Sequence, residues 1–248
     1  MKFVLSQKEI EDFLKAFAPT FQEARGLVTV LETTPEFVRE VLPPPLEPGE
    51  APVVGVVLVK SIPLNIMAVS VACRFENTLG EYGLGMVLDA DHPIIYGREA
   101  WGEPKKLGEI SLDRAGEHAA GRVSRKGHEV FRVDAEIKEP CEPAPFSSAD
   151  LFHFKYSIKP DATGIEDARL VHVHMDNNVR SAETCEGSAT FGASPYDVYG
   201  DIPVLGVKAM FYVDMDQTVR SRYAARVESE QLLPYAFAKH DDYRLLGF

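Results

Sequence analysis

The residues from position 53 onward contain a succession of short β-type segments, and this pattern most constrains the fold. Segments rich in apolar, β-branched and aromatic residues occur at 53–59, 67–75, 82–88, 152–158, 170–175 and 207–215. Residues 122–137, with Lys126-Gly127 near their middle, fit a β-hairpin. Because strands do not alternate regularly with helices, a doubly wound parallel sheet is disfavoured. The pattern predicts a mostly β (α+β) fold whose strands are mostly antiparallel.

Helices are expected mainly near the start of the chain. Ser6 and Glu9 form a capping-box pattern, followed at helical spacing by Ile10, Phe13, Leu14 and Phe17. A second helix is expected to open at Thr34-Pro35 and to end at the prolines of residues 43–45. No repeat or flexible linker divides the chain, so we expect one domain over residues 1–248. The aromatic-rich residues 229–248 are expected to pack on this domain or on a neighbouring subunit.

Composition and charge exclude several classes of protein. The formal net charge is −12, and an acidic surface repels phosphate backbones, so no nucleic-acid partner is expected. No apolar stretch approaches the roughly 18 residues of a membrane span, and residues 1–10 lack the apolar core of a secretion signal. Three cysteines without CxxC spacing disfavour a disulfide framework and a zinc finger. We therefore expect a cytoplasmic protein with no membrane partner.

The segment with the most chemical information is residues 96–108, YGREAWGEPKKLG. On composition alone, two adjacent lysines behind a proline indicate a solvated turn. Gly-Arg-Glu, four residues and then Pro-Lys-Lys-Leu-Gly, however, resembles the signature of the acetoacetate decarboxylase family. The resemblance also includes a proline-rich stretch after the second helix, a strand that runs into LDADHPIIYGRE, and Gly-Asp-Ile-Pro-Val at 200–204. It covers roughly residues 25–227.

The resemblance implies a fold, an activity and a set of site residues. The fold would be an antiparallel β-barrel-like body with peripheral helices, assembled into homo-oligomers. The activity would be that of a lyase that decarboxylates a small β-keto acid without metal or other cofactor. Lys105 would be the Schiff-base nucleophile and Lys106 its cationic neighbour, while Arg98 and Glu99 would hold the lysine loop or face the pocket.

A lysine suits this reaction because a protonated imine accepts the electrons left by carbon dioxide better than a ketone does. The amine must attack as a free base, yet an ordinary lysine, with a pKa of about 10.4, is protonated at pH 7. Burial and a second cation both favour the free amine, and acetoacetate decarboxylase itself is the established example. If residues 104–107 are extended, Lys106 points away from Lys105. We therefore expect burial to be the main cause and Lys106 the lesser one.

The groups that handle the substrate carboxylate do not match the family pattern. The resemblance implies two glutamates and an upstream arginine, but residues 53–59 and 61–70 contain no acidic residue. Glu76 and Glu81 fall several residues too late, and Arg25 is out of register by about one position. The same imine could therefore serve an aldolase-dehydratase that joins a pyruvate-like α-keto acid to an aldehyde. A non-catalytic barrel that binds a small ligand is the alternative of another class.

Several further residues are candidates for the pocket. Tyr82 could be a general acid or a core tyrosine, and Trp101 could wall the pocket or pack the loop. Glu76 could contact substrate or pair with Arg74 at a strand end. The sequence also places His172, His174 and Asp176 on one face of a strand. The two imidazoles could begin a metal site, but a third ligand is not evident, so no metal is expected.

Overall fold

The structure is a computed structural model that describes residues 3–16, 20–62 and 64–246. Its strands are β1 Thr20–Glu32, β2 Glu47–Pro48, β3 Val53–Ile62, β4 Asn65–Phe75, β5 Thr78–Leu88, β6 Lys105–Leu107, β7 Glu109–Ala115, β8 His118–Arg125, β9 His128–Pro140, β10 Ser148–Ile158, β11 Ile165–Phe191 and β12 Gly206–Arg226. The α-helices are α1 Gln7–Ala16, α2 Pro35–Val41, α3 Asp91–Trp101 and α4 Ser229–Leu232, and the 3-10 helices are η1 Ala144–Phe146, η2 Val198–Asp201, η3 Leu233–Lys239 and η4 Tyr243–Leu246. No helix of the described residues is both long and apolar enough to cross a bilayer.

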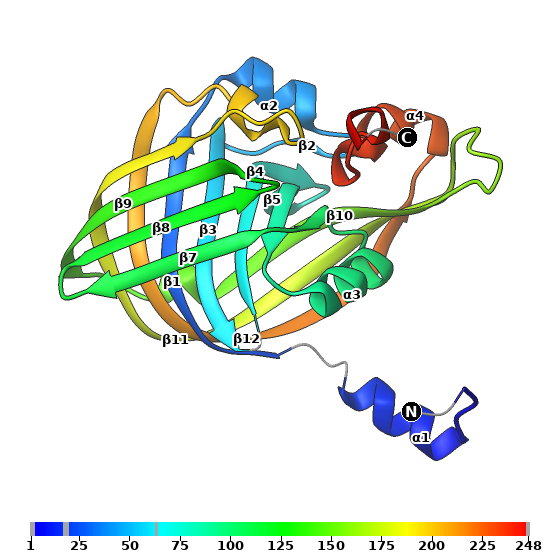
Figure 1. Ribbon diagram of the computed structural model, residues 1–248, viewed down its shortest axis with the longest axis horizontal. Helices are drawn as coiled ribbons and strands as arrows, with labels where there is room; N and C mark the ends of the chain where they lie inside the picture. Colours follow the sequence, from blue (N-terminus) through cyan, green and yellow to red (C-terminus); the bar gives the residue numbers. More distant parts are fainter. Residues whose placement is uncertain (1–2, 17–19, 63, 247–248) are drawn as a thin grey trace.

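Seven of the strands form a closed ring. Their hydrogen-bonded order is β10-β5-β4-β3-β1-β12-β11, and β11 pairs with β10 to close it. All pairings in the ring are antiparallel except that of β10 with β5, which joins Leu151 to Glu81 and Phe152 to Tyr82. Figure 1 shows the strongly curved strands wrapping around a common interior. The expected β-rich, barrel-like fold with peripheral helices is therefore confirmed.

A second layer covers one outer side of the ring. Strands β7, β8 and β9 continue the sheet from β11, because β11 is long enough to pair with β12 along one half and with β9 along the other. Leu58 of β3 shares a core cluster with Leu112 of β7 and Phe131 of β9. The main hydrophobic core therefore lies between the ring and this outer layer (Figure 1).

The strand period explains how the ring has both a packed outer face and a hollow inner face. Successive side chains of a strand point to opposite faces. In β1, Leu27 and Leu31 belong to the core cluster, whereas Val28 and Val30 line a cavity inside the ring. The same strands therefore build the hydrophobic core with their outer face and a cavity with the face that points into the ring.

The expected N-terminal helices are present with the expected caps. In α1, the Ser6 amide donates to Glu9 Oε2 at 2.9 Å, which is one half of the capping box. In α2, the Phe37 amide donates to Thr34 Oγ1 at 3.2 Å. The hairpin turn at Lys126-Gly127 also forms, with φ of 48° and 81°. These local signals predicted the structure correctly.

Several elements differ from what the sequence predicted. The segment that ends LDADHPIIYGRE is not a strand throughout, because β5 stops at Leu88 and α3 occupies Asp91–Trp101. Strands β1 and β7 were not expected, and β11 runs over 27 residues rather than over 170–175. The polar residues after Met175 concealed the strand because one of its faces meets solvent.

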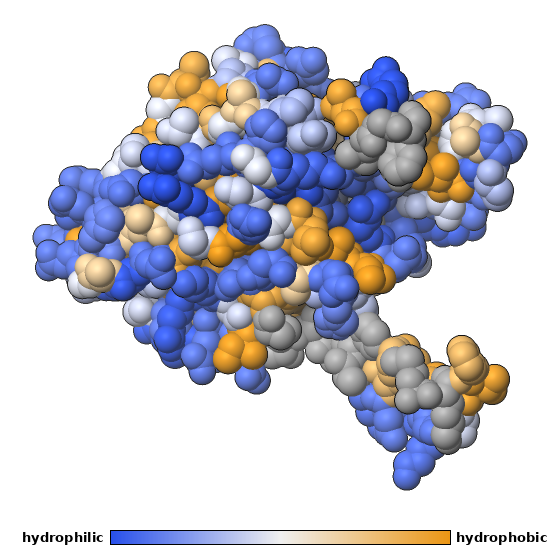
Figure 2. All heavy atoms as spheres, viewed as in Figure 1, coloured by the Kyte–Doolittle hydropathy of each residue, from blue (hydrophilic) through white to orange (hydrophobic). Residues whose placement is uncertain are grey.

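The chain after β12 packs on the body of the domain, as expected. Leu232 of α4 and Ala236 of η3 are almost fully buried in the core cluster. On the face shown in Figure 2, hydrophilic side chains dominate the tips of the β7–β9 layer, while apolar side chains gather over α3 and the adjoining end of β7. Exposed apolar residues of this region include Ile95 and Leu107.

Candidate active site

The interior of the ring contains a cavity of about 330 Å³. Residues from all seven ring strands line it, together with Lys105 at the start of β6. Among the described residues of this lining, only Glu81, Glu103 and Lys105 carry a formal charge. The candidate nucleophile therefore lies in a largely apolar chamber beside two carboxyl groups.

The end of α3 delivers the lysine into the cavity. Gly102 has a φ of 74°, in the left-handed region that glycine adopts without strain. Its amide donates to the Arg98 carbonyl, and the Glu103 amide donates to the Gly97 carbonyl, both at 3.2 Å. This pairing ends the helix as a C-terminal glycine cap does. The chain then turns into β6, where Lys105 pairs in parallel with Met86 of β5.

The Lys105 amine has a close anionic partner. Its Nζ lies 2.6 Å from Glu103 Oε2, and the two side chains are 4% and 3% exposed. It also lies 3.5 Å from the Pro93 carbonyl oxygen and 5.6 Å from the centroid of the Trp101 ring. A carboxylate in direct contact with an amine can accept a proton from it. Glu103 is therefore placed to act as the base for Lys105.

Gly97 of the Gly-Arg-Glu motif makes room for this pair. A methyl group at position 97 would lie 2.6 Å from Lys105 Nζ and closer still to Glu103 Oε2. Gly97→Ala is expected to lower kcat about 10-fold or more, because small displacements of a reacting group are costly. The overlap with two buried side chains is also expected to cost about 1–3 kcal/mol of stability, partly offset by the preference of helices for alanine over glycine. Steady-state kinetics and thermal unfolding would check both.

Gly206→Ala is the matched control, because nothing lies within 4 Å of a methyl group there. It is expected to leave both kcat and the melting temperature unchanged. If Gly97→Ala retains full kcat, the position of the amine is not set by the space at residue 97.

Lys106 points away from Lys105 and does not line the cavity. Its Nζ lies 3.1 Å from Asp197 Oδ1 and 3.6 Å from Asp241 Oδ1. The Arg125 guanidinium contacts the same two carboxylates at 2.8 Å and 2.6 Å. The expected divergence of the two lysine side chains is confirmed. Lys106 thus belongs to a network of three cations (Lys106, Arg125 and Lys126) and two carboxylates that anchors β6.

Glu81 is a second carboxyl group in the cavity. Ser70 Oγ donates a hydrogen bond to Glu81 Oε2. Burial raises the pKa of the Glu81 carboxyl above its usual range, although the hydrogen bond from Ser70 acts in the opposite direction. A raised pKa favours the protonated form. Glu81 can therefore supply a proton inside this largely apolar chamber.

His153 lies behind the Lys105–Glu103 pair. Its Nε2 is 3.8 Å from Glu103 Oε1, and burial lowers the pKa of His153 to about 4, against the opposing effect of Glu103. The imidazole is thus neutral at pH 7. Neither of its ring nitrogens has a hydrogen-bond partner among the described residues. The neutral ring adds bulk beside Glu103 without adding a competing charge.

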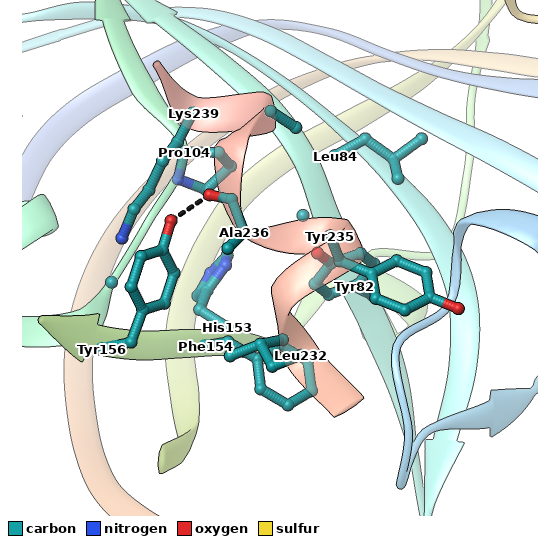
Figure 3. A pocket seen from close by; sticks show the side chains of 13 residues that line it. Tyr82, Leu84, Pro104, His153, Phe154, Tyr156, Leu232, Tyr235, Ala236 and Lys239 are labelled. Atoms are coloured by element: carbon teal, nitrogen blue, oxygen red, sulfur yellow. Dashed lines mark hydrogen bonds between the residues drawn. The ribbon is translucent and has the colours of Figure 1, made fainter. Parts of the chain in front are cut away.

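The C-terminal segment closes the rear of this region. Figure 3 shows η3 lying over His153, with Lys239 along the ring of Tyr156, whose hydroxyl donates to the Ala236 carbonyl. Lys239 Nζ is 3.7 Å from the ring centroid, and burial lowers the pKa of Lys239 to about 8. The cavity between η3 and Tyr82 measures only about 30 Å³, close to the volume of a single water molecule. A keto acid therefore fits the ring cavity and not this one.

Three of the expected substrate contacts lie outside the ring cavity. Arg25 is on the outer surface, where its Nε lies 2.9 Å from Asp214 Oδ2. Glu76 is exposed in the turn between β4 and β5, with a φ of 53°, and Arg74 pairs with Glu47 at 3.0 Å rather than with Glu76. Tyr82 points to the face of β5 opposite Glu81 and packs edge-on against Phe154. Because successive side chains of a strand point to opposite faces, Tyr82 and Glu81 lie on opposite faces of β5.

The three other residues expected to act near the lysine motif differ in where they lie. Arg98 holds the loop, since its guanidinium lies 3.5 Å from the Lys105 carbonyl oxygen and 3.4 Å from His240 Nδ1. Glu99 is exposed on α3 and does not line the cavity. Trp101 both lines the cavity and packs the loop, with its Nε1 donating to Ser221 Oγ at 2.9 Å.

The two strand histidines both contact Asp150, a carboxylate that the sequence analysis did not consider. Asp150 Oδ1 lies 2.5 Å from His172 Nε2 and 2.8 Å from His174 Nδ1. Asp176 lies 3.3 Å from His174 Nε2 and pairs with Arg220. The expectation missed Asp150 because it comes from the neighbouring strand β10. This cluster does not line the ring cavity.

The sequence analysis missed Glu103 and set Glu81 aside. Glu103 precedes Lys105 by two residues, and such spacing in an extended segment places both side chains on one face. Glu81 shares a face of β5 with the cavity residue Gly83. The pairing of β4 with β5 shifts register between Val69 and Ser70, where Leu84 of β5 has no partner in β4. The contact of Ser70 with Glu81 joins two strands, and the three-dimensional register is needed to see it.

Comparisons with known proteins agree with the fold and the motif. The family model described as acetoacetate decarboxylase (ADC) matches residues 8–227. The acetoacetate decarboxylase of Burkholderia cenocepacia is 27% identical over 221 residues, which covers 80% of this chain and 85% of the relative. The crystal structure of acetoacetate decarboxylase from Legionella pneumophila superposes with a TM-score of 0.76 at 21% identity, covering 84% of this chain and 87% of the other.

A further structural neighbour has a different described chemistry. The enduracididine biosynthesis enzyme MppR, complexed with the condensation product of pyruvate and imidazole 4-carboxaldehyde, superposes with a TM-score of 0.68 at 21% identity. The overlap covers 83% of this chain and 88% of that one. Likeness at this identity establishes the fold alone. With the family model spanning most of its length, the chain belongs to the acetoacetate decarboxylase family.

Proposed function

We propose that this chain is a Schiff-base lyase that decarboxylates a β-keto acid through Lys105. The observation that carries the proposal is the contact of 2.6 Å between the buried Lys105 amine and Glu103 inside the ring cavity. An amine in such a place has a base beside it, little competition from water, and room for a carbonyl compound.

The reaction begins with formation of the imine. The ammonium of Lys105 passes a proton to Glu103, and the free amine attacks the ketone carbon of the substrate. A proton of the attacking nitrogen moves to the substrate oxygen, and Glu103 then gives its proton to the resulting hydroxyl, which leaves as water, so that the product is a protonated imine. In total the Lys105 ammonium gives two protons to the departing water, and Glu103 ends the exchange as the carboxylate, ready for the reverse step.

The carbon–carbon bond breaks next. Its electron pair moves into the protonated imine and gives a neutral enamine, while the carboxylate departs as neutral carbon dioxide. The apolar lining supports this step, because it favours states in which charge has disappeared. The Glu81 carboxyl then protonates the enamine carbon, and water hydrolyses the resulting imine to release the ketone and restore Lys105. Glu81 regains its proton from solvent.

Aldol addition with dehydration is a second candidate. The two carboxyl groups in the cavity, Glu81 and Glu103, support it, because dehydration needs one group to remove a proton and another to protonate the departing hydroxyl. The enamine would then attack an aldehyde instead of a proton. The similarity to an enzyme whose described ligand is a pyruvate–aldehyde condensation product keeps this reaction in consideration.

Borohydride trapping tests the proposal. The protein would be incubated with acetoacetate, and in a second tube with pyruvate, then reduced and analysed by intact mass and peptide mapping. An adduct on Lys105 with acetoacetate, accompanied by release of carbon dioxide, is expected. An adduct only with pyruvate, with product only when an aldehyde is added, would favour the aldol reaction. Tight binding with no adduct from either acid would leave a non-catalytic binding protein.

A further inference from the structure

The ring cavity is larger than acetoacetate requires. Its volume of about 330 Å³ corresponds to roughly eleven water molecules at about 30 Å³ each. Acetoacetate has seven non-hydrogen atoms, fewer than a cavity of this size can hold. The volume of the cavity lies at the lower end of the range of about 300–1,000 Å³ found for sites that hold drug-sized ligands. A substrate that fills it must extend well beyond the reacting carbons.

The charged groups are confined to one side of the ring. Lys105 and Glu103 come from β6 and the loop before it, and Glu81 comes from β5, the strand with which β6 pairs. In the closed order β10-β5-β4-β3-β1-β12-β11, strands β1 and β12 lie three places from β5 in either direction. The side of the cavity opposite the amine is therefore built by β1 and β12.

That opposite side is apolar. Val28 and Val30 of β1 and Met215 of β12 line it, next to Val57 and Val59 of β3. The polar pair beside them is engaged within the protein, because the Gln217 amide nitrogen donates to Asn177 at 3.1 Å and Asn177 donates to the Phe146 carbonyl at 2.8 Å. No arginine lines the cavity among the described residues. A carboxylate at the far end of a substrate would therefore find no cationic partner on that side.

We infer that the substrate of Lys105 is a carbonyl compound with an unbranched apolar tail, such as a medium-chain β-keto acid, whose tail extends across the ring to Val28, Val30 and Met215. This inference rests on the proposed imine chemistry and specifies its substrate class. The head of the substrate reacts beside β5 and β6, and its tail is recognised by burial alone. Each buried methylene should raise kcat/KM about fourfold.

The test is a chain-length series with straight-chain β-keto acids of four to eight carbons. The rate of the borohydride-trapped adduct and the release of carbon dioxide would both be measured on the wild-type protein. Across four added methylenes, kcat/KM is expected to rise about 200-fold. Equal rates along the series, or a fall from acetoacetate onward, would overturn the inference while leaving the imine mechanism intact. Absence of an adduct with every acid would instead contradict the proposed function.

Val28→Phe places a larger side chain on the wall opposite the amine. It is expected to remove most of the gain in kcat/KM with chain length. Val198→Phe, at a position 70% exposed on η2, is the matched control and should keep the full chain-length dependence. If Val28→Phe retains the wild-type dependence, the tail does not reach β1, and the inferred binding mode is wrong.

Discussion

Replacing Lys105 with methionine is expected to abolish the borohydride adduct and to lower kcat by at least about 10⁴-fold. Methionine keeps most of the length and apolar volume of the lysine side chain but has no amine to form an imine. Losses of this size or larger follow removal of the nucleophile in enzymes that react through a covalent intermediate. Intact mass after reduction and product release under saturating substrate would measure the two effects.

The neighbouring lysine gives a matched control. Lys106→Met removes an ammonium group from the network of Asp197 and Asp241, yet Arg125 still contacts both carboxylates. We expect this variant to keep the adduct and to lose about 1–3 kcal/mol of stability, since Asp197 retains Arg125 and Asp241 retains Arg125 and Lys126. The reverse pattern, an adduct on Lys105→Met and none on Lys106→Met, would show that Lys106 and not Lys105 is the nucleophile.

Replacing Glu103 with glutamine is expected to slow formation of the adduct and to lower kcat by about 10²–10³-fold. Glutamine preserves the shape of the side chain but cannot accept the proton of the Lys105 ammonium, and a positioned base typically contributes a factor of this size. The rate that remains should rise steadily with pH, because hydroxide in solution must then remove the proton. Single-turnover trapping across a pH range would measure this.

A purely structural role of Glu103 predicts something else. In that case the melting temperature of Glu103→Gln would fall while the rate of adduct formation stayed at the wild-type level. Glu103→Asp separates the two further, because it retains a carboxylate at a longer distance from the amine. It should recover part of the rate that glutamine loses. If aspartate and glutamine variants react equally slowly, the carboxylate is not the base.

Local signals in the sequence predicted much of the fold. The capping box at Ser6 and the Thr34-Pro35 helix start are encoded within a few residues, and both are present. The apolar strands 53–59 and 67–75 lie within β3 and β4. Helix α3 was not predicted, because its proline, its glycine and its short apolar run resemble a strand end. Only the left-handed Gly102 and the contacts of the folded loop show where that helix stops.

The candidate site was predictable only where a linear motif carries it. Gly-Arg-Glu and Pro-Lys-Lys identified Lys105, and the extended backbone of residues 104–107 correctly predicted that Lys106 would diverge. Arg25 and Glu76 were chosen by their order in the chain, and the structure places both outside the cavity. Glu81 reaches the cavity on the same face of β5 as Gly83 and meets Ser70 of the neighbouring strand β4 there. Such register information comes from pairing between strands and not from the sequence of either strand.

The seam where β10 pairs with β5 closes the chamber around Lys105. It joins segments some seventy residues apart through Leu151–Glu81 and Phe152–Tyr82. Pairing over such a separation requires closure of a long loop. Glu81 lies on this seam, so the wall beside it is complete only where β10 has paired with β5. A fragment that lacks β10 would therefore leave the cavity open next to Glu81 and Lys105.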